Sequence, residues 1–169
     1  GTTGQPKGIK RPLSGASITD GQLLGAMLGG VFGVTPDTVY LSPAPIYHSA
    51  PLGFSLAVQS IGGTVVMLER FDPLLALGVI ERRQVTCSQW VPTMFTRMLK
   101  LPDDERAEFD VSSLEVAIHA AAPCPVPVKQ AMMEWWGPVL WEYYAGTEGN
   151  GFCLVKPEDW LARPGTVGR

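Results

Sequence analysis

The sequence predicts an α/β protein with a doubly wound, mainly parallel sheet flanked by helices. Short β-rich runs alternate with longer helical patterns, and Gly or Pro separates most of them. The clearest unit spans residues 64–91, where Asp72 and Pro73 have the residue types of an N-cap and a first helical position between two strands. Such alternation favours parallel strands joined by right-handed crossovers.

Each element is expected from its residue pattern. Helices are expected where apolar residues recur at helical spacing between a capping residue and a Gly or Pro stop, at residues 22–32, 52–61, 73–83, 92–99, 126–136 and 157–161. Strands are expected where β-branched and aromatic runs stand between turns, at residues 38–41, 64–68, 85–91, 114–119, 139–143 and 151–155. The run 64–68 (TVVML) has the composition of a buried strand, and 43–51 (PAPIYHSAP) is too proline-rich for regular structure.

Composition restricts the class of protein. With 169 residues, 46% hydrophobic and 17% charged, the chain is expected to form one globular domain. Its net charge of −3 argues against a nucleic-acid partner. Three widely spaced cysteines, Cys87, Cys124 and Cys153, indicate reduced thiols. Neither a leader-like start nor an apolar run of about 18 residues is visible, so we expect no transmembrane segment and a cytoplasmic location.

A phosphate-binding loop is the first functional candidate, at residues 1–8 (GTTGQPKG). Its glycines permit close backbone approach, its threonines offer hydroxyls, and Lys7 carries a mobile positive charge, which together suit an oligophosphate. Lys7 is followed by Gly8 and not by Ser or Thr, so this is not the common NTPase phosphate loop. By itself the same composition also describes an ordinary surface turn.

A second candidate is the segment 143–149 (YYAGTEG), which follows a predicted strand, as do the unusual segments 43–50 and 120–127. Ligands of parallel sheets gather at the carboxyl ends of strands. Tyr144 could lie against a purine, Thr147 could bind a phosphate oxygen, and Glu148 is an oxygen ligand suited to the Mg²⁺ that accompanies ATP. The alternative is a strand-ending turn with a capping Thr and a solvated Glu.

The segments GTTGQPKG and YYAGTEG, in this order and well over a hundred residues apart, resemble the adenylate-forming superfamily of acyl-CoA synthetases, luciferases and peptide-synthetase adenylation domains. The resemblance covers the whole chain: 45–48 (PIYH) resembles the family's aromatic-His segment, 121–123 (AAP) its adenine loop, and 164–168 (PGTVG) a recurrent turn. It implies that residues 1–169 are part of the large AMP-binding domain. An N-terminal portion and a C-terminal lid domain with a catalytic lysine would lie outside them.

The resemblance implies ATP-dependent activation of a carboxylic acid to an acyl-adenylate and its transfer to coenzyme A, most like a fatty-acid or aryl acyl-CoA synthetase. It also implies a role for each matching residue. The β- and γ-phosphates would be held by Thr2, Thr3, Gly4 and Lys7. The α-phosphate would contact Thr147, and Mg²⁺ would be bound by Glu148. Adenine would be flanked by Tyr144, Ala121, Ala122 and Pro123, and the acyl group would face Tyr47, His48, Ala120 and Tyr143. Of these, Lys7, Thr147, Glu148 and His48 would be catalytic.

Several departures and alternatives accompany this interpretation. Ala120 and Ala145 stand where the family often has glycine, and Tyr143 where a smaller residue is common, so the acyl pocket is expected to be reshaped. A peptide-synthetase-type adenylation domain and a non-catalytic α/β binding module are the alternatives. Residues 1–169 alone are expected to be inactive as a ligase and, because a truncated sheet exposes strand edges, poorly soluble. His119 is expected to pair locally and Cys124 to pack.

Overall fold

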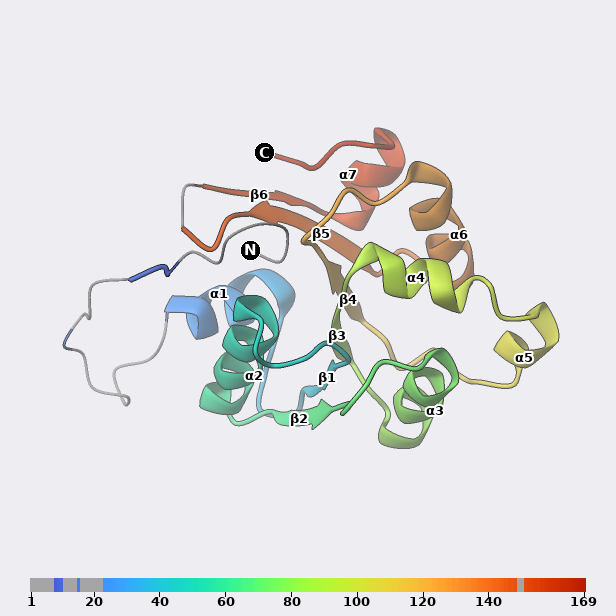
Figure 1. The fold of residues 1–169 in the computed structure, drawn as a ribbon, viewed down its shortest axis with the longest axis horizontal. Helices are drawn as coiled ribbons and strands as arrows, with labels where there is room; N and C mark the ends of the chain where they lie inside the picture. Colours follow the sequence, from blue (N-terminus) through green and yellow to red (C-terminus); the bar gives the residue numbers. More distant parts are fainter. Residues whose placement is uncertain (1–7, 11–14, 16–22, 149–150) are drawn as a thin grey trace.

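The computed structural model describes residues 8–10, 15, 23–148 and 151–169. Within this part of the chain, one six-stranded sheet has the order β2-β1-β3-β4-β5-β6 (Figure 1). Every neighbouring pair from β2 to β5 is parallel, and β6 is antiparallel to β5. The strands are β1 (Val39–Ser42), β2 (Thr64–Met67), β3 (Cys87–Trp90), β4 (Val116–His119), β5 (Leu140–Ala145) and β6 (Phe152–Val155). The predicted mainly parallel sheet is confirmed.

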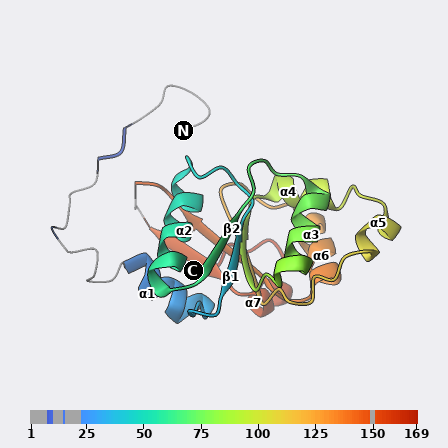
Figure 2. The ribbon, with the colours of Figure 1, turned by 90° about the horizontal axis from the view of Figure 1, so that it is seen from below.

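Helices cover both faces of the sheet, which confirms the doubly wound arrangement (Figure 2). On one face, α1 and α2 pack over a core that includes Tyr40, Cys87 and Ile118. On the other, α3, α4, α6 and α7 cover a larger core centred on Trp90 and Phe95. The helices are α1 (Leu23–Phe32), α2 (Ser49–Ile61), α3 (Pro73–Arg83), α4 (Pro92–Met98), α5 (Asp103–Ala107), α6 (Val126–Trp136) and α7 (Pro157–Ala162).

Local sequence signals place two helices correctly to the residue. Asp72 caps α3 as predicted, because its Oδ1 accepts a hydrogen bond from the Leu75 backbone N–H at 3.0 Å, and Pro73 takes the first helical position. Helix α6 has the predicted bounds and ends at Gly137, whose φ of 83° is a conformation that favours glycine. The start of α3 and the end of α6 therefore rest on residue types that can be recognised in the sequence.

The prediction that residues 64–68 form a buried strand is wrong. Among the described residues, β2 lies at the edge of the sheet and pairs with β1 alone. Its two end residues, Thr64 and Met67, are exposed, and Met67 retains 54% of its accessible surface. A β-branched apolar run has the same composition in a central strand and in an edge strand, so only the pairing order distinguishes them.

Two predicted boundaries also need correction. Helix α2 begins at Ser49 and not at residue 52, because Pro51 falls in its first turn, where a missing backbone N–H costs nothing. Strand β5 continues through Ala145 and not only to residue 143, since antiparallel pairing of Tyr144 with Cys153 and of Ala145 with Phe152 extends it. Tyr144 is therefore a strand residue and not part of the following loop.

Candidate functional site

The candidate residues that the structure describes lie at the carboxyl ends of β1, β4 and β5, Tyr143 and Tyr144 within the last residues of β5 and the others after a strand. β4 and β5 are neighbours, and their register pairs His119 with Glu142. The segment after β4 and the last residues of β5 therefore start side by side. Because parallel strands present their carboxyl ends at the same edge, residues 120–123 and 144–148 can contribute to one surface.

Residues 120–125 connect β4 to α6 in a short, partly strained loop. Ala120 is buried, and its N–H donates to the Trp90 carbonyl at 3.4 Å. Ala121 has a φ of 76°, a left-handed conformation that alanine adopts at a cost of about 1 kcal/mol or more. Ala121, Ala122 and Pro123 are exposed. The left-handed residue of the loop is therefore Ala121 and not Ala120, and the tip of the loop faces solvent.

Cys124 closes this loop and packs against the larger core, as predicted. Burial, with a smaller contribution from the Glu142 carboxylate, raises the pKa of its thiol to about 11. A nucleophilic cysteine needs the opposite shift, so the thiol is not activated.

Thr147 and Glu148 follow β5 in an exposed turn. The Glu148 carboxylate is open to solvent and could serve as an oxygen ligand of a cation. In the described part of the chain, no three His, Cys, Asp or Glu side chains gather into a metal site.

The two tyrosines at the end of β5 point to different environments. Tyr144 retains 69% of its surface and offers an open aromatic face. Tyr143 stacks between Phe54 of α2 and Phe152 of β6, with ring centroids 6.0 and 5.5 Å away. The Gln89 Nε2 donates to the Tyr143 hydroxyl at 3.1 Å, and burial raises the pKa of Tyr143 to about 12. Tyr143 is therefore a neutral phenol that is fixed on the α1–α2 face.

Side-chain hydrogen bonds connect Tyr143 to two other strands of the sheet. Gln89 of β3 also accepts a hydrogen bond from the Tyr40 hydroxyl at 3.5 Å, so β1, β3 and β5 are joined on one face. Sequence analysis did not single out Gln89. Its position in a strand whose four residues are all buried could have marked it as a polar group in need of a partner.

Tyr47 and His48 lie in the loop between β1 and α2. Their rings are adjacent, with centroids 4.4 Å apart, and Tyr47 retains 80% of its surface. In the sheet order β3 separates β1 from β4. The pair therefore lies at the same end of the sheet as the other candidates, but not next to residues 120–123. The predicted phosphate-binding residues Thr2, Thr3, Gly4 and Lys7 lie outside the described residues.

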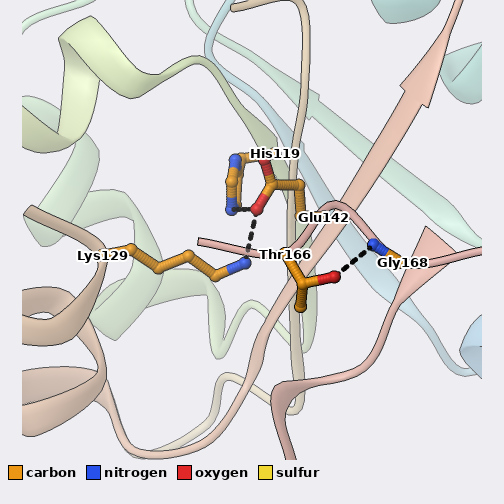
Figure 3. A network of polar contacts seen from close by, with 5 residues as sticks. All are labelled: His119, Lys129, Glu142, Thr166 and Gly168. Atoms are coloured by element: carbon orange, nitrogen blue, oxygen red, sulfur yellow. Dashed lines mark hydrogen bonds and ion pairs between the residues drawn. The ribbon is translucent and has the colours of Figure 1, made fainter. Parts of the chain in front are cut away.

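A buried charged cluster below this surface was missed from the sequence. Lys129 of α6 donates to the Glu142 Oε2 at 2.8 Å, and the same oxygen is 3.5 Å from the His119 Nε2 (Figure 3). Burial, followed by the Lys129 charge, lowers the pKa of His119 to about 3, so its contact with Glu142 is that of a neutral imidazole. The expected local pairing of His119 is not found: neither ring nitrogen has a hydrogen-bond partner among the described residues, and the contact with Glu142 comes from the neighbouring strand.

The sequence did contain a sign of this cluster. Lys129, Met132, Met133 and Trp136 follow each other at helical spacing, and all four are buried. In β5, Leu140 and Glu142 alternate with less buried residues. Each pattern places a charged residue among buried apolar ones, so the sequence could have predicted that Lys129 and Glu142 form a buried ion pair.

Among the described residues, the mainly parallel sheet carries an Ala-Ala-Pro loop after β4 and a Thr-Glu turn after β5, and both segments start at its carboxyl edge. The whole chain, residues 1–169, matches the family described as AMP-binding enzyme, and the protein belongs to this family. The resemblance to adenylate-forming enzymes is thereby confirmed.

Several of the curated relatives are CoA ligases, and two of them illustrate the likeness. The chain is 32% identical over 150 residues to a medium/long-chain-fatty-acid–CoA ligase of Mycobacterium tuberculosis (88% of this chain, 24% of the relative). It is 28% identical over 171 residues to a 2-succinylbenzoate–CoA ligase of Bacillus pumilus (100% of this chain, 33% of the relative). The chain thus spans a third or less of the length of these relatives.

Solved structures agree with this assignment. The o-succinylbenzoate CoA synthetase of Bacillus subtilis, solved with its acyl-adenylate intermediate, superposes with a TM-score of 0.78 at 25% identity, over 100% of this chain and 33% of that one. The fold is therefore that of the N-terminal domain of adenylate-forming enzymes. None of the helices in the described residues has both the length and the apolar character needed to cross a bilayer.

Proposed function

We propose that the protein containing this chain uses ATP to activate a carboxylic acid as an acyl-adenylate and then transfers the acyl group to coenzyme A. The observation that carries the proposal is the pairing of β4 with β5, because it starts the Ala121–Pro123 loop and the Tyr144–Glu148 segment side by side at one edge. Membership of the AMP-binding family supports it.

In the first step, a carboxylate oxygen of the acid attacks the α-phosphorus of ATP, the bond to the bridging oxygen breaks, and pyrophosphate leaves. Two anions must approach each other, so positioned cations and hydrogen-bond donors lower the barrier. Lys7 with Thr2, Thr3 and Gly4 would hold the β- and γ-phosphates. Thr147 would contact the α-phosphate.

Recognition of the base and of the acid would fall to different segments. Tyr144 offers an exposed ring to one face of adenine, and the exposed tip of the loop, Ala121–Pro123, offers the other wall. Tyr47 and His48, which follow β1, would face the acyl group from one side, and Ala120 and Tyr143, at the ends of β4 and β5, would face it from another. Because Tyr143 is a bulky ring fixed between two phenylalanines, the acyl pocket would be narrow at that wall.

Glu148 would hold Mg²⁺ through its exposed carboxylate. The bound ion supplies neutralisation of phosphate charge. In the second step the sulfur of coenzyme A attacks the acyl carbonyl carbon, the bond to the AMP oxygen breaks, AMP leaves, and the thiol proton passes to solvent. His48, which lies in the loop before α2, would guide the thiol to the carbonyl.

The proposal is tested by exchange of labelled pyrophosphate into ATP, measured on the whole protein with a panel of carboxylic acids. Lys7→Ala and Glu148→Gln are each expected to slow acid-dependent exchange about 100-fold, because Lys7 would neutralise phosphate charge directly and Glu148 would hold the Mg²⁺ that does so. Lys10→Ala and Glu158→Gln are matched controls, since Lys10 and Glu158 are exposed residues outside the proposed site.

The two controls are expected to exchange at the wild-type rate. Exchange that does not depend on any added acid, or that survives both Lys7→Ala and Glu148→Gln unchanged, would contradict the proposed reaction. Coenzyme A consumption after adenylate formation, followed with a thiol reagent, tests the acceptor separately.

A further inference from the structure

The buried cluster Lys129, Glu142 and His119 includes the residue before the Ala-Ala-Pro loop and a residue of the helix that follows it. The Lys129 and His119 side chains are fully buried, and the Glu142 side chain retains 8% of its surface. The single oxygen Oε2 of Glu142 is the common partner, at 2.8 Å from the Lys129 Nζ and 3.5 Å from the His119 Nε2 (Figure 3). One carboxylate oxygen therefore connects a helix, a strand and the end of a second strand.

Burial of this cluster carries a large unfavourable desolvation free energy. Removing an ammonium and a carboxylate from water costs more than their attraction commonly returns, so an apolar pair of similar volume is often as stable or more stable. Burial lowers the pKa of Lys129, which the nearby Glu142 charge opposes, and the Trp160 ring, 4.9 Å from Nζ, gives partial compensation. Stability alone therefore does not explain the Lys129–Glu142 pair. Its directional hydrogen bond suits a role in fixing the position of neighbouring segments.

The positions of these residues in the chain indicate that the pair holds the loop 120–125 in place. His119 is the last residue of β4, and Lys129 lies in the first turn of α6, so the two flank the loop 120–125. Glu142 contacts both flanks from β5. The only described backbone hydrogen bond of Ala120 is the long one to Trp90, at 3.4 Å, while Ala121 holds a left-handed φ of 76°. A strained residue persists only where its surroundings over-determine it.

Glu142 also belongs to the second candidate segment. It lies two residues before Tyr144 and six before Glu148 on the same strand and its extension. The hydrogen bond from Lys129 to Glu142 therefore ties the start of α6, and with it the loop, to the strand that carries Tyr144.

We propose that Lys129 and Glu142 are positioning residues that set the distance between the Ala121–Pro123 loop and Tyr144, and so the width of the slot for adenine. The proposal rests on the proposed function, in which these two segments flank the base. It assigns the pair a role in nucleotide affinity in addition to its role in packing, with His119 as the neutral neighbour that fills the remaining space beside Glu142.

The test separates positioning from stability with three variants of the whole protein: Lys129→Met, Glu142→Leu and the double variant. Each single variant leaves one buried charge or removes its partner, and is expected to lower Tm. The double variant replaces the pair by apolar side chains and is expected to recover Tm close to that of the wild type. Its affinity for AMP, measured by calorimetry, is expected to remain weakened about tenfold, because apolar contact does not fix the loop.

Steady-state kinetics provide the second readout. For the double variant, the KM for ATP is expected to rise about tenfold while the KM for the acid stays within about twofold of the wild type, since only the adenine slot changes. Glu142→Gln keeps the acceptor oxygen and is expected to retain most of the AMP affinity. Leu77→Ala, in the fully buried part of α3, is the control that lowers Tm without changing AMP affinity.

The outcomes distinguish the two proposals. If the wild type binds AMP and the double variant binds it equally well with recovered Tm, the pair is only structural and the positioning role is overturned. If the wild type neither binds AMP nor catalyses pyrophosphate exchange, the proposed function fails and the positioning role fails with it. If the double variant does not fold, full AMP affinity in a folded Lys129→Met variant overturns the positioning role, and a weakened affinity there, with Leu77→Ala unchanged, supports it.

Discussion

His119 illustrates how one buried side chain can limit stability at acid pH. Its imidazole is fully enclosed, lies edge-on to the Phe95 ring at 5.6 Å between centroids, and has no hydrogen-bond partner for either ring nitrogen among the described residues. Burial and the Lys129 charge lower its pKa from 6.5 to about 3. Between these two values the unfolded chain binds a proton that the folded chain does not.

Stability should therefore fall as pH decreases from about 6.5 towards 3. Between pH 7 and pH 4.5, the wild type is expected to lose roughly 2 kcal/mol of unfolding free energy from this residue. His119→Gln, which cannot titrate, should lose correspondingly less. The measurement is urea unfolding of the whole protein at both pH values.

His48→Gln is the matched control for this experiment, because His48 is the other of the two histidines in the sequence and is partly exposed. It is expected to keep the acid sensitivity of the wild type. If His119→Gln and the wild type lose equal stability on acidification, His119 does not stay neutral in the folded protein.

Among the elements, β6 depends on the segment that follows α7. The Leu154 N–H donates to the Arg169 carbonyl at 3.1 Å, and the Gly168 N–H donates to the Thr166 hydroxyl at 3.2 Å. Gly168 has a φ of 87°, and a Cβ added to it would overlap the Leu154 carbonyl. The residues around Gly168 can therefore cover the outer side of β6 only because no side chain is present there.

Gly168→Ala is expected to displace this segment from β6 and to reduce stability by about 1–3 kcal/mol, the usual range for forced backbone strain. The Leu154 amide should then exchange with deuterium faster. Tm and hydrogen exchange of the whole protein measure both effects.

Gly30→Ala is the control for that substitution. Gly30 lies in α1 with nothing within 4 Å of an added Cβ, so alanine there should raise stability by about 0.5–1 kcal/mol. Unchanged Tm and unchanged Leu154 exchange in Gly168→Ala would mean that the segment is not held against β6 in solution.

At the scale of the whole molecule, the open edge of the sheet is the main liability. In the part of the chain that the structure describes, β2 has β1 as its one neighbour, and Met67 exposes 54% of its surface there. Unpaired N–H and C=O groups beside an exposed apolar side chain are a template for association with another strand. This geometry agrees with the expectation that residues 1–169 alone would be poorly soluble, which remains a prediction.

Met67→Lys is therefore expected to decrease aggregation of isolated residues 1–169, since a charge on an edge strand opposes pairing with a second copy. Light scattering at increasing protein concentration measures this. Leu161→Lys removes a similarly exposed apolar side chain, at 50%, from helix α7 and should have a smaller effect. Equal improvement by both variants would indicate general hydrophobic association and not edge pairing.

The sequence by itself determined the local elements and the family. Asp72 and Pro73 start α3 through interactions within one turn, Gly137 ends α6, and the alternation of strands with helices predicts the parallel sheet. The ordered segments GTTGQPKG and YYAGTEG were sufficient to indicate an adenylate-forming enzyme. These features depend on short-range chemistry, so they are readable along the chain.

Only the tertiary structure decided which residues meet. The order of the strands places residues 64–67 at the edge of the sheet. Antiparallel pairing with β6 extends β5 through Ala145. The register of β4 with β5 brings Glu142 between His119 and Lys129. Each of these depends on partners distant in sequence, and a residue's composition does not specify its partner. The candidate adenine loop was therefore predictable as a motif, whereas the buried charge pair beneath it became visible only in the folded chain.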